Sequence, residues 1–177
     1  MHGDPPSPET QAGYRAARRA FIAACEKANV ETVARLHPTK GPDGKPLFMD
    51  CAAMGARGAA KAVLVVSYDA PGSETMIAFL SQKLPADAKL VLVHALDPAA
   101  FAGVAGEPAW PAAMLGAVAV EDLSRVRHLG VMPLGRRDEA LAAMLQAHLP
   151  GAVLTALPQG ATPAKAWAEI MGFFTAH

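Results

Sequence analysis

The sequence predicts an α/β protein: a single three-layer domain with a mixed, largely parallel sheet flanked by helices. Residues 62–67 and 89–95 each contain a continuous apolar run rich in β-branched residues, which is typical of strands buried on both faces. Segments with helical spacing of apolar residues alternate with these strands, and this alternation favours parallel pairing with helices on both faces. The chain has 177 residues, a length that suits one domain.

The N-terminal part is expected to add a helix and a hairpin to this core. Residues 1–12 are polar and Pro-rich, so we expect a flexible leader before a domain that spans residues 13–177. Tyr14, Phe21 and Cys25 share a helical spacing, which predicts an amphipathic helix over residues 13–28. The prolines and glycines of residues 37–46 predict a turn between two short strands. These strands are expected over residues 29–34 and 47–53.

The remaining elements alternate along the chain. Ser73 is expected to cap a helix over residues 73–83, and Thr162 is expected to cap the closing helix over residues 162–175. Between them we expect strands over residues 126–132 and 152–157 and a helix over residues 137–148. Residues 112–120 fit a helix or a strand equally well.

Composition excludes several classes of protein. Hydrophobic residues make up 52% of the chain, which is too many for a disordered protein, and no apolar run is long enough to span a membrane. Lys and Arg number 16, as do Asp and Glu, so there is no electrostatic case for a nucleic-acid partner. A chain without net charge is prone to associate, so we expect a protein partner or self-association.

The two cysteines, Cys25 and Cys51, do not make a disulfide framework, and we expect both to be reduced and largely buried. The first eleven residues contain no apolar secretory segment. A cytoplasmic location is the resulting expectation.

Candidate sites are expected at the carboxyl ends of the strands, where open α/β sheets bind their ligands. The first such junction, residues 67–74, contains the carboxylates Asp69 and Glu74 but no histidine. A catalytic zinc needs three convergent protein ligands, so this loop alone does not make a metal site. It also lacks the spacing of a phosphate loop. The simplest interpretation is a turn that leads into a helix capped by Ser73.

The second junction contains His94, at the end of a buried strand. A lone histidine in this position is more often a hydrogen-bonded core residue than a catalyst. The third junction is the most basic, with four side chains that can bind an anion: Arg125, Arg127, His128 and Arg136. The competing interpretation is a solvated surface where these groups pair with neighbouring carboxylates. The fourth junction, residues 157–162, has no ionisable side chain.

Several segments, taken in order, resemble one family. They are residues 37–50, 62–67, 90–102, 128–136 and 154–163, and the third, which includes His94, Asp97 and Pro98, is the most specific. In these segments the chain resembles zinc-carboxypeptidase-like proteins of the M14-related, DUF2817 type, near the succinylglutamate desuccinylase/aspartoacylase branch. The resemblance implies a zinc-peptidase-like core, truncated here in its substrate-binding portion.

The resemblance also implies where the functional residues of the family would lie. Its zinc-binding His and Glu fall on Ala70 and Ser73, its later His ligand falls on His128, and its catalytic Glu falls on Pro158. Only one of the three zinc ligands persists, so the resemblance implies no metal, no cofactor and no catalytic residue in this chain. We therefore expect a pseudoenzyme that acts as a binding, regulatory or structural subunit.

Two alternatives stay open. The first is a metal-dependent hydrolase, a peptidase or deacylase, with a zinc site rebuilt from residues that the fold would have to bring together: Asp69, Glu74, His94 and His128. The second is a protein that binds anions or small carboxylates through the basic residues of the third junction, together with His94.

Overall fold

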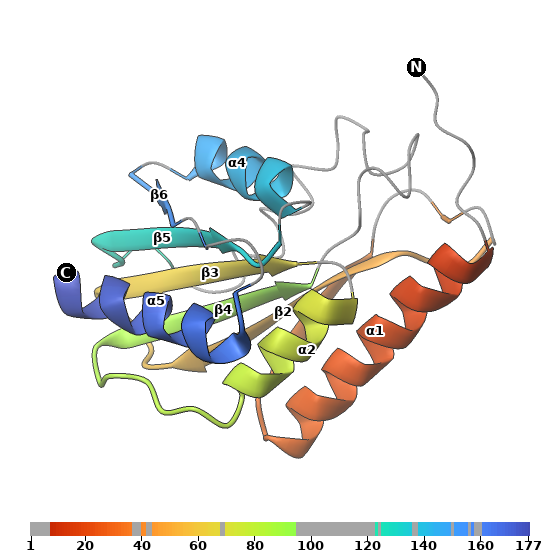
Figure 1. The fold of residues 1–177 in the computed structure, drawn as a ribbon, viewed down its shortest axis with the longest axis horizontal. Helices are drawn as coiled ribbons and strands as arrows, with labels where there is room; N and C mark the ends of the chain where they lie inside the picture. Colours follow the sequence, from red (N-terminus) through yellow and green to blue (C-terminus); the bar gives the residue numbers. More distant parts are fainter. Residues whose placement is uncertain are drawn as a thin grey trace.

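A six-stranded mixed sheet forms the centre of the computed structural model, with the strand order β1-β2-β4-β3-β5-β6 (Figure 1). The structure describes residues 8–36, 40–41, 44–67, 70–94, 123, 125–135, 138–149, 151–155, 157 and 161–177. The predicted class, an α/β fold with a mixed sheet flanked by helices, is confirmed.

The central strands are the apolar runs of the sequence. β3 (Lys61–Ser67) lies between β4 (Ala88–His94) and β5 (His128–Pro133) and is parallel to both. Residues 62–67 and 88–94 are all buried, as expected for strands covered on both faces. The short β6 (Val153–Leu154) continues the parallel part beside β5.

The two N-terminal strands extend the sheet on its other side. β1 (Thr32–Leu36) and β2 (Phe48–Gly55) pair antiparallel, as expected for a hairpin-like excursion. β2 also pairs antiparallel with β4, with Asp50 opposite His94. This second pairing places a residue of the N-terminal hairpin at the carboxyl end of a core strand.

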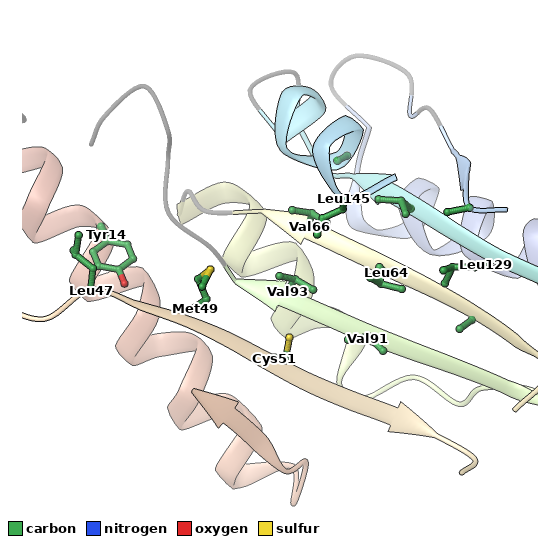
Figure 2. Packing of buried hydrophobic residues seen from close by; sticks show 14 residues of the cluster. Tyr14, Leu47, Met49, Cys51, Leu64, Val66, Val91, Val93, Leu129 and Leu145 are labelled. Atoms are coloured by element: carbon green, nitrogen blue, oxygen red, sulfur yellow. The ribbon is translucent and has the colours of Figure 1, made fainter. Parts of the chain in front are cut away.

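Helices cover both faces of the sheet (Figure 1). On one face lie α1 (Pro8–Lys27), α2 (Ala70–Phe79) and α5 (Pro163–Ala176), which contribute to the same hydrophobic cluster as Val63, Val65 and Leu92. On the other face α4 (Glu139–His148) packs on Leu64, Val66 and Val131. Figure 2 shows this second cluster, which continues along β2 and β4 through Met49, Cys51, Val91 and Val93.

Several predicted boundaries were wrong. α1 begins at Pro8, within the segment expected to be a leader. α2 begins at Ala70 and ends at Phe79, so Ser73 lies inside the helix and is not its cap. β6 has two residues where six were expected. Thr162 does cap α5, since its side chain accepts a hydrogen bond from the Lys165 backbone N–H at 3.2 Å. Residues 112–120 lie outside the described part of the chain.

None of the described helices combines the length and the apolar character that crossing a bilayer requires.

Candidate functional site

Three polar side chains lie next to one another at the carboxyl ends of β3 and β4. The strand register pairs Asp50 of β2 with His94 of β4, and His94 with Ser67 of β3. All three are fully buried. Because side chains two residues apart share a face, this polar row lies on the same face as Ala52, Leu92 and Val65, beneath α1. We call Asp50, His94 and Ser67 the polar row.

Asp50 forms a bidentate ion pair with Arg18 of α1. The Arg18 Nε donates to Asp50 Oδ2 at 2.8 Å, and Nη2 donates to Oδ1 at 3.1 Å. The guanidinium also lies over the ring of Phe48, 4.0 Å from its centroid. Burial raises the pKa of Asp50 above its ordinary 3.8, and the bonds from Arg18 offset only part of this rise. The carboxylate therefore depends on Arg18 for compensation of its buried charge.

His94 is enclosed by aromatic rings from α1. Its ring stacks on Phe21, with 5.5 Å between centroids, and on Tyr14, with 6.3 Å. Burial lowers the pKa of His94 from 6.5 to about 4, with a further contribution from the positive charge of Arg18, so the ring is neutral at pH 7. Neither ring nitrogen of His94, nor the Ser67 hydroxyl, has a hydrogen-bond partner within the described part of the chain.

Two more hydrogen bonds tie α1 to this end of the sheet. The Tyr14 hydroxyl donates to the Phe48 carbonyl at 2.9 Å and accepts from the Phe48 N–H at 3.0 Å. The Ser73 hydroxyl of α2 donates to the Ala17 carbonyl of α1 at 3.2 Å. The polar groups around the row thus join α1 to β2 and α2.

Of the described side chains in the first two junctions, Ser67 and His94 lie in the polar row. Glu74 is exposed on α2. Asp69, Arg136 and Pro158 lie outside the described residues, as does the side chain of Ala70.

His128 lies at the opposite end of the sheet from His94. The register pairs His128 with Lys61, at the start of β3, whereas His94 pairs with Ser67, at its end. Six residues of strand at about 3.3 Å each separate the two levels by about 20 Å. The structure therefore does not bring His128 together with His94, because His128 begins β5 and does not end it.

Two of the other basic candidates, Arg125 and Arg127, precede His128 directly in the described part of the chain. The backbone N–H groups of Arg127 and His128 both donate to the Ala60 carbonyl, at 2.7 and 3.1 Å. Arg125, Arg127 and His128 are exposed, and the His128 ring stacks on that of His177 with 4.7 Å between centroids. These residues form a basic surface at the amino end of the parallel strands, and an anion site there stays a prediction.

The polar row does not supply the donor set of a zinc site. Catalytic zinc takes three protein ligands. In the row, both carboxylate oxygens of Asp50 accept hydrogen bonds from Arg18. His94 is then the one side chain of the row with a nitrogen atom that could bind zinc. More widely, no three His, Cys, Asp or Glu side chains gather at a metal-binding spacing among the described residues.

The sequence prediction assigned neither Arg18 nor Asp50 to a site, although Asp50 ends the first segment of the family resemblance. Arg18 follows Tyr14 by four residues and precedes Phe21 by three, so it lies on the apolar side of the helix. Asp50 is a lone charge between Met49 and Cys51 in an apolar strand. Two opposite charges at positions that must both be buried indicate an ion pair, and this signal was available in the sequence.

Comparison with known proteins places the chain in a family. A family model described as "Protein of unknown function (DUF2817)" matches residues 11–104, which is more than half of the 177 residues. The chain belongs to the DUF2817 family. The matched region includes all of α1 after its first turn, β1 to β4 and the whole polar row. No curated protein matches the chain in sequence.

Solved structures similar to this DUF2817 member are distant. Glutaminyl cyclase from Porphyromonas gingivalis has a TM-score of 0.49 at 8% identity, over 91% of this chain and 80% of that one. A putative Zn-dependent exopeptidase from Bacteroides vulgatus has a TM-score of 0.45 at 13% identity, over 75% of this chain and 55% of that one. LapA aminopeptidase from Legionella pneumophila has a TM-score of 0.44 at 12% identity, over 94% of this chain and 52% of that one. The chain therefore spans about half the length of the last two.

Proposed function

We propose that this DUF2817 member is a non-catalytic, M14-related protein that acts as a binding, regulatory or structural subunit. The observation that carries the proposal is the bidentate bond from Arg18 to Asp50. This ion pair lies at the carboxyl ends of the parallel strands, where open α/β sheets bind their ligands. There Arg18 and Tyr14 join α1 to β2.

The ion pair makes Asp50 a poor ligand and a poor base. A carboxylate that accepts two guanidinium N–H bonds would have to give them up to bind a metal, leaving the half-buried Arg18 without its partner. A general base must also lie within hydrogen-bond reach of a substrate proton. Asp50 is fully buried, Arg18 binds both of its oxygens, and the Phe48 ring lies against the Arg18 guanidinium.

His94 and Ser73 support the same conclusion. His94 is neutral and fully buried, and its ring stacks with Phe21 and Tyr14. Ser73, where the family resemblance implies a zinc-binding Glu, donates its hydroxyl to the Ala17 carbonyl. These side chains stabilise the contact of α1 with the rest of the fold.

A second candidate function is a metal-dependent hydrolase with a rebuilt site. The observation in its favour is that His94 and Ser67 keep polar atoms without described hydrogen-bond partners at the carboxyl ends of two parallel strands. A third candidate, an anion-binding protein, is favoured by the exposed basic residues Arg125, Arg127 and His128 before and at the start of β5.

Metal analysis of the full chain separates the first two functions. The protein is expressed without a histidine tag, purified without chelator, dialysed against zinc and then against metal-free buffer, and analysed by mass spectrometry for bound metal. We expect much less than one zinc per chain. One tightly held zinc per wild-type chain, lost in His94→Gln but kept in His148→Gln, would establish the metal site and overturn the proposal. His148 is an exposed histidine on α4 and serves as the matched control.

Thermal shift with phosphate and with small carboxylates tests the third function. A stabilisation that disappears in Arg127→Gln would support an anion site at the amino end of the strands. No shift at millimolar ligand would exclude it.

A further inference from the structure

Within the described part of the chain, β1 forms an open edge of the sheet. It is the first strand in the order β1-β2-β4-β3-β5-β6, and among the described residues only β2 pairs with it. Its last three residues are exposed, and Leu36 has 62% of its surface accessible, the largest value among the exposed large hydrophobic side chains. An exposed edge strand presents unpaired N–H and C=O groups to any strand that can add to it.

The opposite edge is a weaker candidate for such addition. β6 has two residues, too few for a ladder of hydrogen bonds, although Val153 and Leu154 are exposed by 54% and 41%. β1 has five residues, and Glu31 precedes it in the described chain.

We propose that β1 pairs antiparallel with β1 of a second copy of this chain, about a two-fold axis at Val33. In this register Val33 lies opposite Val33 of the second copy, and Thr32 lies opposite Ala34. A pair formed in this way uses the same surface on both copies, as a closed two-fold dimer requires. The inference goes beyond the proposed function, because it holds whether or not the chain is catalytic.

Charge complementarity selects this register. With Val33 at the axis, Glu31 of each copy lies opposite Arg35 of the other, so two symmetric ion pairs form across the strands. Shifting the axis to Thr32 or Ala34 places Glu31 opposite neither Arg35 nor any other described basic residue. Both side chains are exposed, and neither forms an ion pair within the described part of the chain.

The apolar residues of the edge fit the same arrangement. Thr32, Ala34 and Leu36 alternate on one face of the strand, and Val33 and Arg35 lie on the other. Continuing the register places Leu36 opposite Val30 of the second copy. The exposed leucine thereby gains an apolar partner, and a β-branched pair lies at the centre of the interface.

Charge reversal tests the pairing without altering the buried parts of the fold. Glu31→Arg alone would place two arginines opposite each other, and Arg35→Glu alone would place two glutamates opposite each other. The double variant E31R/R35E restores opposite charges in both pairs. An equimolar mixture of the two single variants also has opposite charges, but only between unlike chains.

Sedimentation equilibrium over a concentration series measures the outcome. We expect wild type and E31R/R35E to form dimers, each single variant to dissociate with a Kd raised about tenfold or more, and the mixture of single variants to associate again. Circular dichroism checks that every variant keeps the secondary structure. A wild type that stays monomeric up to its solubility limit would overturn the proposal, as would single variants that dimerise normally or a mixture that does not associate.

Discussion

At the scale of single residues, His94 makes stability depend on pH. Its pKa is about 4 in the folded protein and ordinarily 6.5. Between these values the unfolded chain binds a proton that the folded chain does not, so stability falls as the pH falls. Asp50 acts in the opposite direction. Its pKa is raised in the folded chain, so near and above pH 3.8 the folded chain binds a proton at Asp50 before the unfolded chain does, and this contribution to stability increases as the pH falls.

We therefore predict that the wild type loses about 2 kcal/mol of unfolding free energy between pH 7 and pH 5 through His94. His94→Phe keeps an aromatic ring between Tyr14 and Phe21 and should lose this part of the pH dependence. Urea unfolding of both proteins at both pH values measures the difference, and the contribution of Asp50 largely cancels in the comparison. Equal pH dependence of the two proteins would show that His94 is not buried in a neutral form.

The pair of Arg18 and Asp50 gives a second prediction at this scale. Arg18→Met should cost about 3–5 kcal/mol, because it leaves a buried carboxylate without its partner. Adding Asp50→Asn removes that charge and should recover part of the loss, although Asp50→Asn alone destabilises. Urea unfolding at pH 7 measures all three variants.

Arg19→Met is the matched control for this pair. Arg19 is the next residue of α1 and is exposed, so its replacement should change stability by about 0.5 kcal/mol or less. If Arg18→Met behaved like Arg19→Met, the buried ion pair would not contribute to the fold.

At the scale of elements, two glycines should respond to the same substitution with opposite signs. Gly55 ends β2 with a φ of +103°, and a Cβ there would meet the Ala88 carbonyl oxygen. Gly55→Ala should therefore destabilise by more than about 1 kcal/mol. Gly172 lies within α5 with nothing within 4 Å of an added Cβ, so Gly172→Ala should stabilise by about 0.5–1 kcal/mol. Thermal unfolding measures both, and shifts of the same sign would contradict the structure.

The elements also show what sequence reasoning can find. Periodicity and local capping identified β3, β4 and α5, because a buried strand or a capped helix carries its signal within its own residues. Ser73 was misassigned because a serine followed by apolar residues also occurs inside a helix. Here its hydroxyl bonds to a carbonyl 56 residues away, on another helix.

The polar row was missed for a related reason. Asp50 and His94 meet through the antiparallel pairing of β2 with β4, and Arg18 reaches Asp50 across 32 residues. Strand order and register are properties of the assembled sheet, so a prediction of individual elements does not contain them. His128 was misplaced because it was assigned to a site at the carboxyl end of a strand, whereas it is the first residue of β5.

At the scale of the whole molecule, one sheet separates two hydrophobic clusters. Leu64 belongs to the cluster under α4, and Leu92 to the cluster under α1, α2 and α5, and both are fully buried. Because β3 and β4 are hydrogen-bonded neighbours, loss of packing on one face should weaken the other. We therefore predict that the chain unfolds as a single unit.

Trp167 allows this prediction to be tested across the sheet. Trp167 packs against the cluster that contains Leu92. Because the chain has 2 tryptophans, Trp110→Phe leaves Trp167 as the one tryptophan whose fluorescence reports unfolding. In that background, Leu64→Ala and Leu92→Ala should each cost about 2–5 kcal/mol. Each should move the urea midpoints of Trp167 fluorescence and far-UV circular dichroism together. If Leu64→Ala moved the dichroism transition and left that of Trp167 in place, the two layers would unfold separately, and the single-domain prediction for residues 13–177 would be wrong.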